Sequence, residues 1–256
     1  MIAVLLCAGY ATRMYPLTAD FPKPLLTVAG KPVIDYLVEQ IIDLPEITHI
    51  HVVTNAKFFE HFSAWQMRWR SATASKKIAF VVHNDGSTDN ANRLGAAADL
   101  RFVFKQIAKP TRVLASGGDN IFRFRLEPLW RDFLTGQRHY VIALPESNEN
   151  RLMKSGVLAL GKENRVLRLH EKPEHPVSRW FCPPLYFLQP TAWPQLDQFL
   201  RTPRNDDAPG YFIDFLSRRE EVYAFKLNAS RLDIGSIDSY REAQEAISKP
   251  LSNDLP

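Results

Sequence analysis

The chain has 256 residues, enough to bury a sizeable core as one large α/β domain or two small ones. Hydrophobic residues make up 45% of it and charged residues 23%, the proportions of an ordinary globular protein, so intrinsic disorder is excluded as the default. The 32 Lys and Arg residues only slightly outnumber the 28 Asp and Glu residues, and the net charge of +4 is too small to act alone as a polyphosphate footprint, so we expect no nucleic-acid partner.

The cysteines and the N-terminal residues narrow the class of protein further. Cys7 and Cys182 lie far apart on apolar stretches, a spacing that fits neither a disulfide framework nor a metal site, so we expect two buried thiols. The apolar residues 1–8 lack a basic leader and a cleavage site, and they are far too few to span a bilayer. We therefore expect a cytoplasmic protein that contacts no membrane.

Short β-branched runs alternate with amphipathic segments of helical length through the first half of the chain. The predicted strands are residues 2–8, 49–55, 77–83 and 139–145, and residues 111–120 are predicted to be a strand that runs into a loop. The predicted helices are residues 31–43, 58–69, 92–106 and 126–134. This alternation implies an α/β fold with a doubly wound, mostly parallel Rossmann-like sheet and right-handed crossovers.

The pattern changes after residue 145. Three short apolar runs separated by turns, residues 155–161, 164–172 and 183–190, predict a small inserted antiparallel β layer. The chain is completed by predicted helices at 191–201 and near 211–220, a strand at 222–228 and a closing helix at 236–248. No linker-like tract marks a boundary, so we expect a single domain over residues 1–256.

The loop after the first strand is the first candidate site, because ligands of open parallel sheets bind beyond the carboxyl ends of the strands. Residues 9–25 supply backbone N–H groups, two cations in Arg13 and Lys23, and three prolines that stiffen the loop. These features suit the binding of a nucleoside triphosphate. The loop is neither a Walker A loop nor a G-x-G-x-x-G turn, and a solvated surface loop remains the alternative.

Two aspartates follow apolar runs in similar settings. Asp119 comes after two glycines in SGGDNIF, and Asp233 precedes a glycine turn and a helix capped by Ser236 in RLDIGSIDSY. At strand ends of one sheet they could meet over one Mg²⁺ ion, which proteins usually hold through one or two carboxylates plus substrate phosphates. An Asx turn or a helix cap is the alternative for such an aspartate.

Two other polar segments could contact further parts of a substrate. In LHEKPE, Lys172 could bind a phosphate and Glu171 sugar hydroxyls, and the alternative is an exposed charged turn. Within residues 83–96, Asn84 and the backbone at Gly95 could recognise a base, and the alternative is a long connection.

Taken in order, the segments AGYATRMYPLT…PKPLL, GDNIF, SGV, HEKP and LDIGSIDSY resemble the sugar nucleotidyltransferases of the glucose-1-phosphate thymidylyltransferase and uridylyltransferase type. The resemblance runs over nearly the whole chain. It implies a GT-A-like nucleotidyltransferase fold with a nucleotide-binding half in residues 1–136 and a sugar-phosphate-binding half in residues 137–256. It also implies Mg²⁺-dependent transfer of a nucleoside monophosphate, with dTTP or UTP favoured as the donor, to a sugar 1-phosphate with release of pyrophosphate.

The resemblance also implies roles for individual residues. Arg13 and Lys23 would be catalytic and contact the phosphates, and Asp119 and Asp233 would hold Mg²⁺. The nucleotide-binding residues would be Leu6, Ala8, Gly9, Arg13, Lys23, Asn84 and Gly95, and the sugar-phosphate-binding residues would be Gly156, Glu171 and Lys172. No residue need act as nucleophile or general base, because a sugar phosphate with a second pKa of about 6 is already mostly a dianion at neutral pH.

The chain departs from the family pattern at three places. Ala11 stands where the family loop usually has a second glycine, Pro184 stands where a glycine commonly precedes Leu-Tyr-Phe, and the segment after Asn84 is longer than the usual base-reading loop. The base and the sugar are therefore left open. A cytidylyl- or guanylyltransferase acting on another phosphorylated acceptor, and a non-catalytic regulatory protein that binds a nucleotide sugar, are the alternatives. We expect a monomer or a homodimer.

Overall fold

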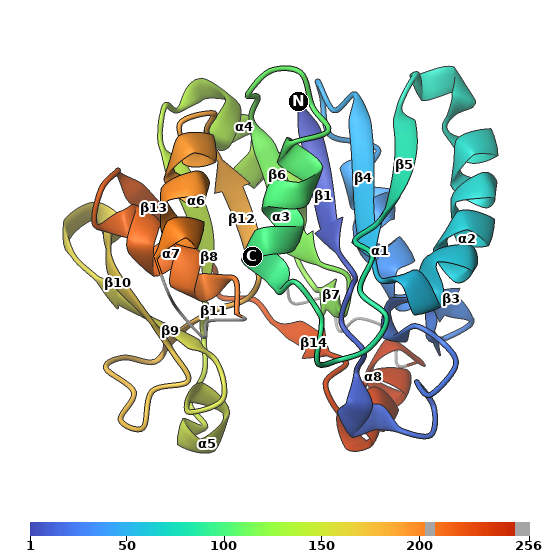
Figure 1. The fold of residues 1–256 in the computed structure, drawn as a ribbon. Helices are drawn as coiled ribbons and strands as arrows, with labels where there is room; N and C mark the ends of the chain where they lie inside the picture. Colours follow the sequence, from blue (N-terminus) through green and yellow to red (C-terminus); the bar gives the residue numbers. More distant parts are fainter. Residues whose placement is uncertain (203–207, 249–256) are drawn as a thin grey trace.

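A ten-stranded sheet runs through the computed structural model, which describes residues 1–202 and 208–248 (Figure 1). Nine strands follow one another in the order β10-β9-β11-β8-β12-β6-β1-β4-β5, and β13 pairs with β8. Their bounds are β1 (Ile2–Leu6), β4 (His49–Thr54), β5 (Ala79–Asn84), β6 (Val113–Gly117), β8 (His139–Pro145), β9 (Gly156–Leu160), β10 (Val166–Glu171), β11 (Trp180–Cys182), β12 (Leu185–Leu188) and β13 (Val222–Lys226).

The first half of the chain supplies a parallel core. Strand β1 lies between β6 and β4 and is parallel to both, and β5 is parallel to β4 at the edge of the sheet. Residues 2–5 of β1 are buried on both faces, as expected for a central strand of a parallel sheet. The mostly parallel sheet predicted from the sequence is confirmed.

The second half supplies antiparallel strands. Strand β12 is antiparallel to both β6 and β8, and β11, β9 and β10 continue the sheet in antiparallel pairs beyond β8. The predicted antiparallel strands are therefore present, and they lengthen the central sheet at one edge. Strand β13 is parallel to β8.

Eight α-helices are described. Their bounds are α1 (Val33–Ile41), α2 (Phe59–Ala72), α3 (Ala96–Phe104), α4 (Leu126–Thr135), α5 (Glu149–Leu152), α6 (Ala192–Arg201), α7 (Gly210–Ser217) and α8 (Ile237–Ser248). One apolar cluster packs α1, α2 and α4 on one face of the sheet, and a second packs α3, α6 and α7 on the other, which is the near face in Figure 1. The sheet is thus covered on both faces, as a doubly wound fold requires. Within the described ranges, every helix is too short or too polar to cross a bilayer.

Two short ladders lie outside the main sheet. Strands β2 (Thr27–Val28) and β3 (Lys31–Pro32) form one hairpin, so the predicted helix at 31–43 begins only at Val33. Strands β7 (Asn120–Phe122) and β14 (Arg231–Asp233) form the other. The strand predicted to run into a loop within 111–120 ends at Gly117, and β7 follows two residues later. A small apolar cluster beside them joins the loop after β1 to α8 through Met14, Val28, Val33, Ile121, Ile234 and Ala243.

The predicted helix at 92–106 begins four residues later than expected. The Asn92 side chain accepts hydrogen bonds from the N–H groups of Thr88 and Asp89, at 2.9 and 3.1 Å, which holds the preceding segment in a turn. Gly95 then adopts a φ of 88°, which favours glycine, and α3 starts at Ala96. The two cysteines are both free and buried, as predicted.

Candidate active site

The loop after β1 is held by hydrogen bonds to one carbonyl group. The Ala11 carbonyl oxygen accepts from the Met14 N–H at 2.9 Å and from the Thr18 hydroxyl at 2.8 Å, and the side chains of Met14 and Thr18 are fully buried. Ala11 itself has φ 49° and ψ 39°, a left-handed conformation that favours glycine. This conformation accounts for the second glycine expected at this position, and it is retained here by an alanine.

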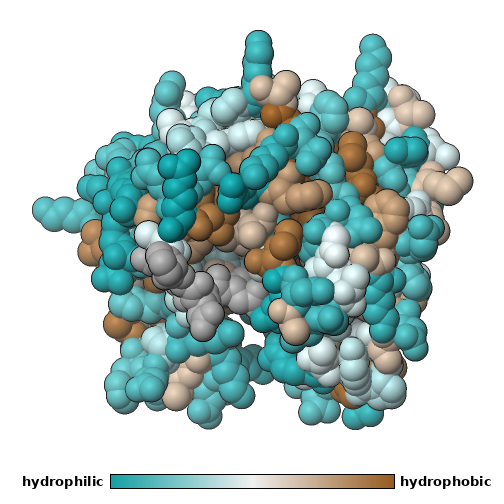
Figure 2. All heavy atoms as spheres, in the orientation of Figure 1, coloured by the Kyte–Doolittle hydropathy of each residue, from teal (hydrophilic) through white to brown (hydrophobic). Residues whose placement is uncertain are grey.

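Two adjoining cavities, of about 230 and 370 Å³, open at the carboxyl end of β1. Both are lined by Leu6, Gly9, Arg13, Arg93 and Asp119. The smaller cavity also contacts Lys23, and the larger one contacts Ala8 and Gly95. In Figure 2 the near face is mostly hydrophilic, and a hollow separates its two lower lobes, one of which carries α5 and the other α8. The structure therefore brings seven of the predicted nucleotide and metal residues to one place.

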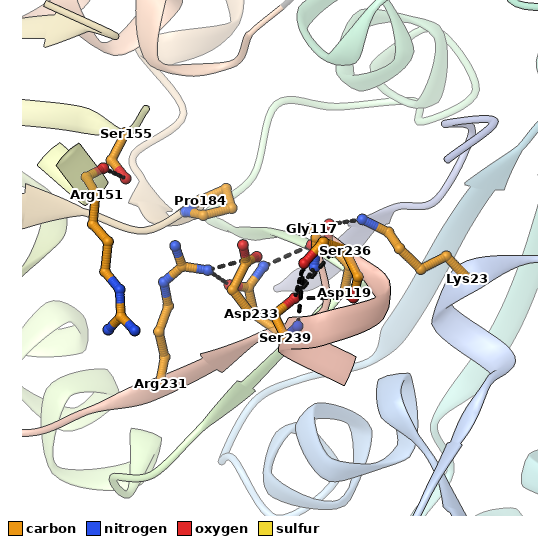
Figure 3. Close-up of polar contacts among 12 residues, drawn as sticks. Lys23, Gly117, Asp119, Arg151, Ser155, Pro184, Arg231, Asp233, Ser236 and Ser239 are labelled. Atoms are coloured by element: carbon orange, nitrogen blue, oxygen red, sulfur yellow. Dashed lines mark hydrogen bonds and ion pairs between the residues drawn. The ribbon is translucent and has the colours of Figure 1, made fainter. Parts of the chain in front are cut away.

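Lys23 and Asp119 form the central ion pair of this site (Figure 3). Lys23 Nζ lies 2.5 Å from Asp119 Oδ2, and the side chains are 15% and 27% exposed. Asp119 Oδ1 accepts a second hydrogen bond, from the Asn120 side-chain amide at 2.6 Å. Burial alone raises the pKa of Asp119, but the charge and hydrogen bond of Lys23, with the charge of Arg231, outweigh burial and lower this pKa below its ordinary value. Asp119 is therefore a carboxylate at neutral pH.

The β7–β14 ladder brings the second predicted metal ligand beside the first. Asp233 pairs directly with Asn120, and the Ile234 N–H donates to the Asp119 carbonyl oxygen at 3.1 Å. The turn after β14 is held by Ser239, whose hydroxyl accepts from the N–H groups of Gly235 and Ser236, and the Ser236 hydroxyl caps α8 by accepting from the Ser239 N–H. The two aspartates thus lie next to each other across one strand pair.

The side chains at the site fit a metal ion that binds together with the substrate phosphates better than one that the protein binds by itself. The described residues contain no group of three or more His, Cys, Asp or Glu side chains that could hold a metal ion. Asp119 and Asp233 offer hard carboxylate oxygens, and Mg²⁺ is commonly bound by two such groups when substrate phosphates complete its coordination.

The predicted base-reading residues are only partly brought into the cleft. Gly95 lines the larger cavity at the start of α3. The Asn84 side chain instead accepts from the Gly86 N–H at 2.9 Å in a local Asx turn, and Asn84 lines neither cavity. Two other residues of the same segment, Asn90 and Arg93, line the smaller cavity, and the sequence analysis named neither of them. The only sequence signal for Arg93 is its position two residues before Gly95.

The predicted sugar-phosphate residues lie together on the neighbouring strands β9 and β10 and directly after β10. Gly156 pairs directly with Glu171, and the Lys172 N–H donates to the Ser155 carbonyl oxygen at 2.9 Å. Burial raises the pKa of Glu171, while Lys172 and a hydrogen bond from the Gly210 N–H partly oppose this rise. These three residues do not line the two cavities, but Ala208 and Pro209, which precede Gly210, line the larger one.

Pro184 forms part of the wall of the larger cavity. Its carbonyl oxygen accepts from the Gly117 N–H at 3.0 Å and from the Ser116 hydroxyl at 2.9 Å, which fixes the residue beside the end of β6. Its ring lies 3.5 Å from where a Cβ on Gly117 would stand. The proline at this position therefore narrows the cavity close to Asp119.

Comparisons with known proteins agree with this geometry. The sequence model described as nucleotidyl transferase matches residues 2–250. The chain is 27% identical over 258 residues to the bifunctional protein GlmU of Methanocaldococcus jannaschii, covering 100% of this chain and 56% of that protein. It is 25% identical over 256 residues to the UTP–glucose-1-phosphate uridylyltransferase AglF of Haloferax volcanii, covering 96% of each chain.

The chain spans about half the length of the first curated relatives that it matches. Among solved structures, UDP-glucose pyrophosphorylase in complex with UDP-glucose superposes with a TM-score of 0.80 over 96% of this chain and 98% of that chain, at 19% sequence identity. This likeness supports the fold, including the antiparallel strands that extend the sheet.

Proposed function

The chain belongs to the nucleotidyl transferase family, and we propose that it transfers a nucleoside monophosphate from a nucleoside triphosphate to a sugar 1-phosphate with release of pyrophosphate. The observation that carries this proposal is the cleft beyond β1, where Arg13 and Lys23 face a cavity that also contains the carboxylate of Asp119. Cations and a carboxylate in one cleft suit a triphosphate and its metal ion.

The cations of the loop have separate tasks in this proposal. The Arg13 guanidinium can hold phosphate oxygens through two parallel hydrogen bonds. The Lys23 ammonium, on its flexible side chain, can move to stabilise the negative charge that develops on the leaving pyrophosphate. Leu6, Ala8 and Gly9 would contact the nucleoside, with Gly95 and Asn90 on its other side. We place nucleotide binding mainly in residues 1–136 and acceptor binding mainly in residues 137–256.

Asp119 and Asp233 would hold Mg²⁺ together with phosphate oxygens of the nucleotide. When bound, the ion would neutralise phosphate charge and orient the α-phosphate for attack. The chain's own contribution is to lower the pKa of Asp119 through Lys23 and to bring Asp233 beside it through the β7–β14 ladder.

The acceptor needs alignment rather than activation. A sugar 1-phosphate is mostly dianionic at neutral pH, since its second pKa is about 6, so its oxygen can attack the α-phosphorus without a protein base. Lys172 would hold this phosphate, and Glu171 and the backbone at Gly156 would contact the sugar. The bond to the pyrophosphate oxygen breaks as the new P–O bond forms, and catalysis consists of positioning and charge stabilisation.

The proposal leaves the base of the nucleotide donor open, and it has two alternatives, another kind of nucleotidyltransferase and a non-catalytic binding protein. The resemblance of the sequence motifs favours dTTP or UTP as the donor, and the name of the relative AglF, a UTP–glucose-1-phosphate uridylyltransferase, supports UTP. A cytidylyl- or guanylyltransferase acting on another phosphorylated acceptor would use the same residues. A non-catalytic protein that binds a nucleotide sugar is disfavoured, because Lys23, Asp119 and Asp233 are all retained and lie together. We propose a cytoplasmic monomer or homodimer.

The test is a matrix of five nucleoside triphosphates against a panel of sugar 1-phosphates, scored by pyrophosphate release with Mg²⁺. We expect turnover in at least one combination, and a decrease of roughly a hundredfold or more in Asp119→Asn. Asp43→Asn, which removes an exposed carboxylate of a surface ion pair, is the matched control and should retain the rate. Absence of turnover in every combination would refute the proposal and favour the binding protein.

A further inference from the structure

Arg231 is a charged residue in contact with the predicted metal ligand Asp233, and the proposed reaction does not use it. It lies on β14 two residues before Asp233, so the two side chains share one face of the strand. Arg231 Nη1 lies 2.8 Å from Asp233 Oδ1 and also donates to the Asn120 side-chain oxygen. Figure 3 shows the Arg231 side chain directed at Asp233.

The guanidinium group of Arg231 is fixed from both sides of the cleft. Its carbon atom lies 4.5 Å from the centre of the Phe181 ring on β11, which belongs to the antiparallel half of the sheet. Asn120 holds the other side from β7. The Arg231 side chain is only 15% exposed, whereas its partner Asp233 is 48% exposed. The more buried member of this ion pair is therefore the arginine.

The Asp233 carboxylate is also fitted closely to the turn that follows it. A Cβ added at Gly235 would stand only 2.8 Å from Asp233 Oδ2, so the carboxylate is seated against the backbone of this glycine. With Oδ1 on Arg231 and Oδ2 close to Gly235, a metal ion that binds Asp233 through Oδ1 competes directly with the arginine contact.

The two predicted metal ligands are thus each neutralised by the protein itself. Lys23 pairs with Asp119, and Arg231 pairs with Asp233, so two carboxylates face two cations. A free divalent cation approaching such a balanced site meets little net negative charge. A cation that arrives with a nucleoside triphosphate brings its own excess of negative charge, for which Lys23 and Arg231 are new partners.

We propose that Arg231 is a positioning residue that competes with a divalent cation for Asp233, so that the site takes up the cation with the nucleotide in preference to the cation alone. The proposal rests on the proposed function only in treating Asp119 and Asp233 as the metal-binding pair. The alternative is that Arg231 simply supports the shape of the site. The two roles predict opposite signs, because removal of a competitor strengthens metal binding and removal of a support weakens it.

Mn²⁺ titration followed by electron paramagnetic resonance, without any nucleotide, distinguishes these roles. We expect Arg231→Gln to bind Mn²⁺ at least about tenfold more tightly than the unmodified chain, because one positive charge beside the ion is removed. Arg231→Lys, which keeps the charge, should stay within about threefold. Arg241→Gln removes an exposed cation from α8, where Arg241 faces Asp238, and is the control for a general change in net charge.

Two results would overturn the proposal. One is Mn²⁺ binding by Arg231→Gln that is unchanged or weaker, with the melting temperature showing that the variant is folded. The other is a gain in affinity that persists in Arg231→Gln/Asp233→Asn, because the gain must depend on the released carboxylate. Pyrophosphate release by the unmodified chain is measured in parallel. Turnover without the Mn²⁺ effect refutes only the role of Arg231, and the Mn²⁺ effect without turnover refutes only the proposed reaction.

Discussion

Lys23→Met removes the ammonium group from the central ion pair and leaves Asp119 without its nearest counter-charge. The distance of 2.5 Å and the low exposure of both side chains place this pair among largely buried ion pairs. Removal of one partner from a buried pair costs about 3–5 kcal/mol of folding free energy. Asp119 keeps the Asn120 amide and the field of Arg231, so we expect a loss near the lower end, about 3 kcal/mol.

Urea unfolding of Lys23→Met, Asp119→Asn and the double variant measures this interaction as a cycle. The double variant should be more stable than the sum of the single losses predicts, by about 1–3 kcal/mol. Lys31→Met is the matched control, since Lys31 and Glu39 form an ion pair at 2.7 Å whose side chains are both exposed. An exposed pair of this kind contributes about 1 kcal/mol or less.

The pH dependence gives a second check, and its sign follows from the shift of Asp119. The folded-state pKa of Asp119 is lowered from 3.8, so the stabilisation is present above that value and is lost as the pH falls through the lower, folded-state pKa. In Lys23→Met, the Asp119 carboxylate is buried without its main counter-charge, which destabilises the folded chain. Protonation of Asp119 at acid pH removes the buried negative charge and so removes this destabilisation. The stability difference between the two chains should therefore be largest near neutral pH and shrink as the pH falls through about 4. This account would be refuted if the stability difference between the two chains were the same near neutral pH and below about pH 4. It would also be refuted if the coupling energy between Lys23 and Asp119 in the urea experiment were near zero.

Two further substitutions test the backbone around the cleft. In Gly210→Ala, the new Cβ would collide with the Glu171 carboxylate, so we expect a loss of about 1–3 kcal/mol in the free energy of unfolding. We also expect a raised KM for the sugar 1-phosphate, with the nucleotide KM little changed. An unaltered acceptor KM in steady-state kinetics would contradict the placement of Glu171. In Ala11→Gly, relief of the left-handed conformation stabilises the folded chain by roughly 1 kcal/mol, and the extra freedom of glycine in the unfolded chain nearly offsets this gain. The free energy of unfolding from thermal denaturation should therefore change by less than about 0.5 kcal/mol. A change above about 1 kcal/mol in either direction would contradict this balance.

Most of the secondary structure was predictable because it depends on local hydrophobic periodicity. Strand β8 occupies the predicted residues 139–145, and the helices at 126–134 and 191–201 agree with the structure to within one residue at each end. The errors lie where polar side chains or short pairings compete with the periodic pattern. Asn92 delays the start of α3, and the β2–β3 hairpin takes the first two residues predicted for α1.

The sequence predicted the candidate-site residues that belong to the recognisable motifs, and it missed those in the segments that connect the motifs. The glycine and charge pattern after β1 pointed to Arg13 and Lys23, and the strand ends pointed to Asp119 and Asp233. The run Asn84-Asp85-Gly86 was a sequence signal for the local turn that Asn84 forms, whereas the position of Arg93 beside the cavity depends on the course of the whole segment before α3. The pairing of Arg231 with Asn120 depends on a contact between distant strands, which periodicity does not report.

The long sequence separations within the cleft have a consequence for folding kinetics. Lys23 and Asp119 are 96 positions apart, and Arg231 and Asn120 are 111 positions apart. Contacts of such high order form only after large loops have closed, which is slow compared with local helix formation. During refolding, metal and nucleotide affinity should therefore return later than helical structure. A fragment that ends before residue 231 would lack Asp233 altogether, so we expect it to lack the proposed metal site however much of its helical structure has formed.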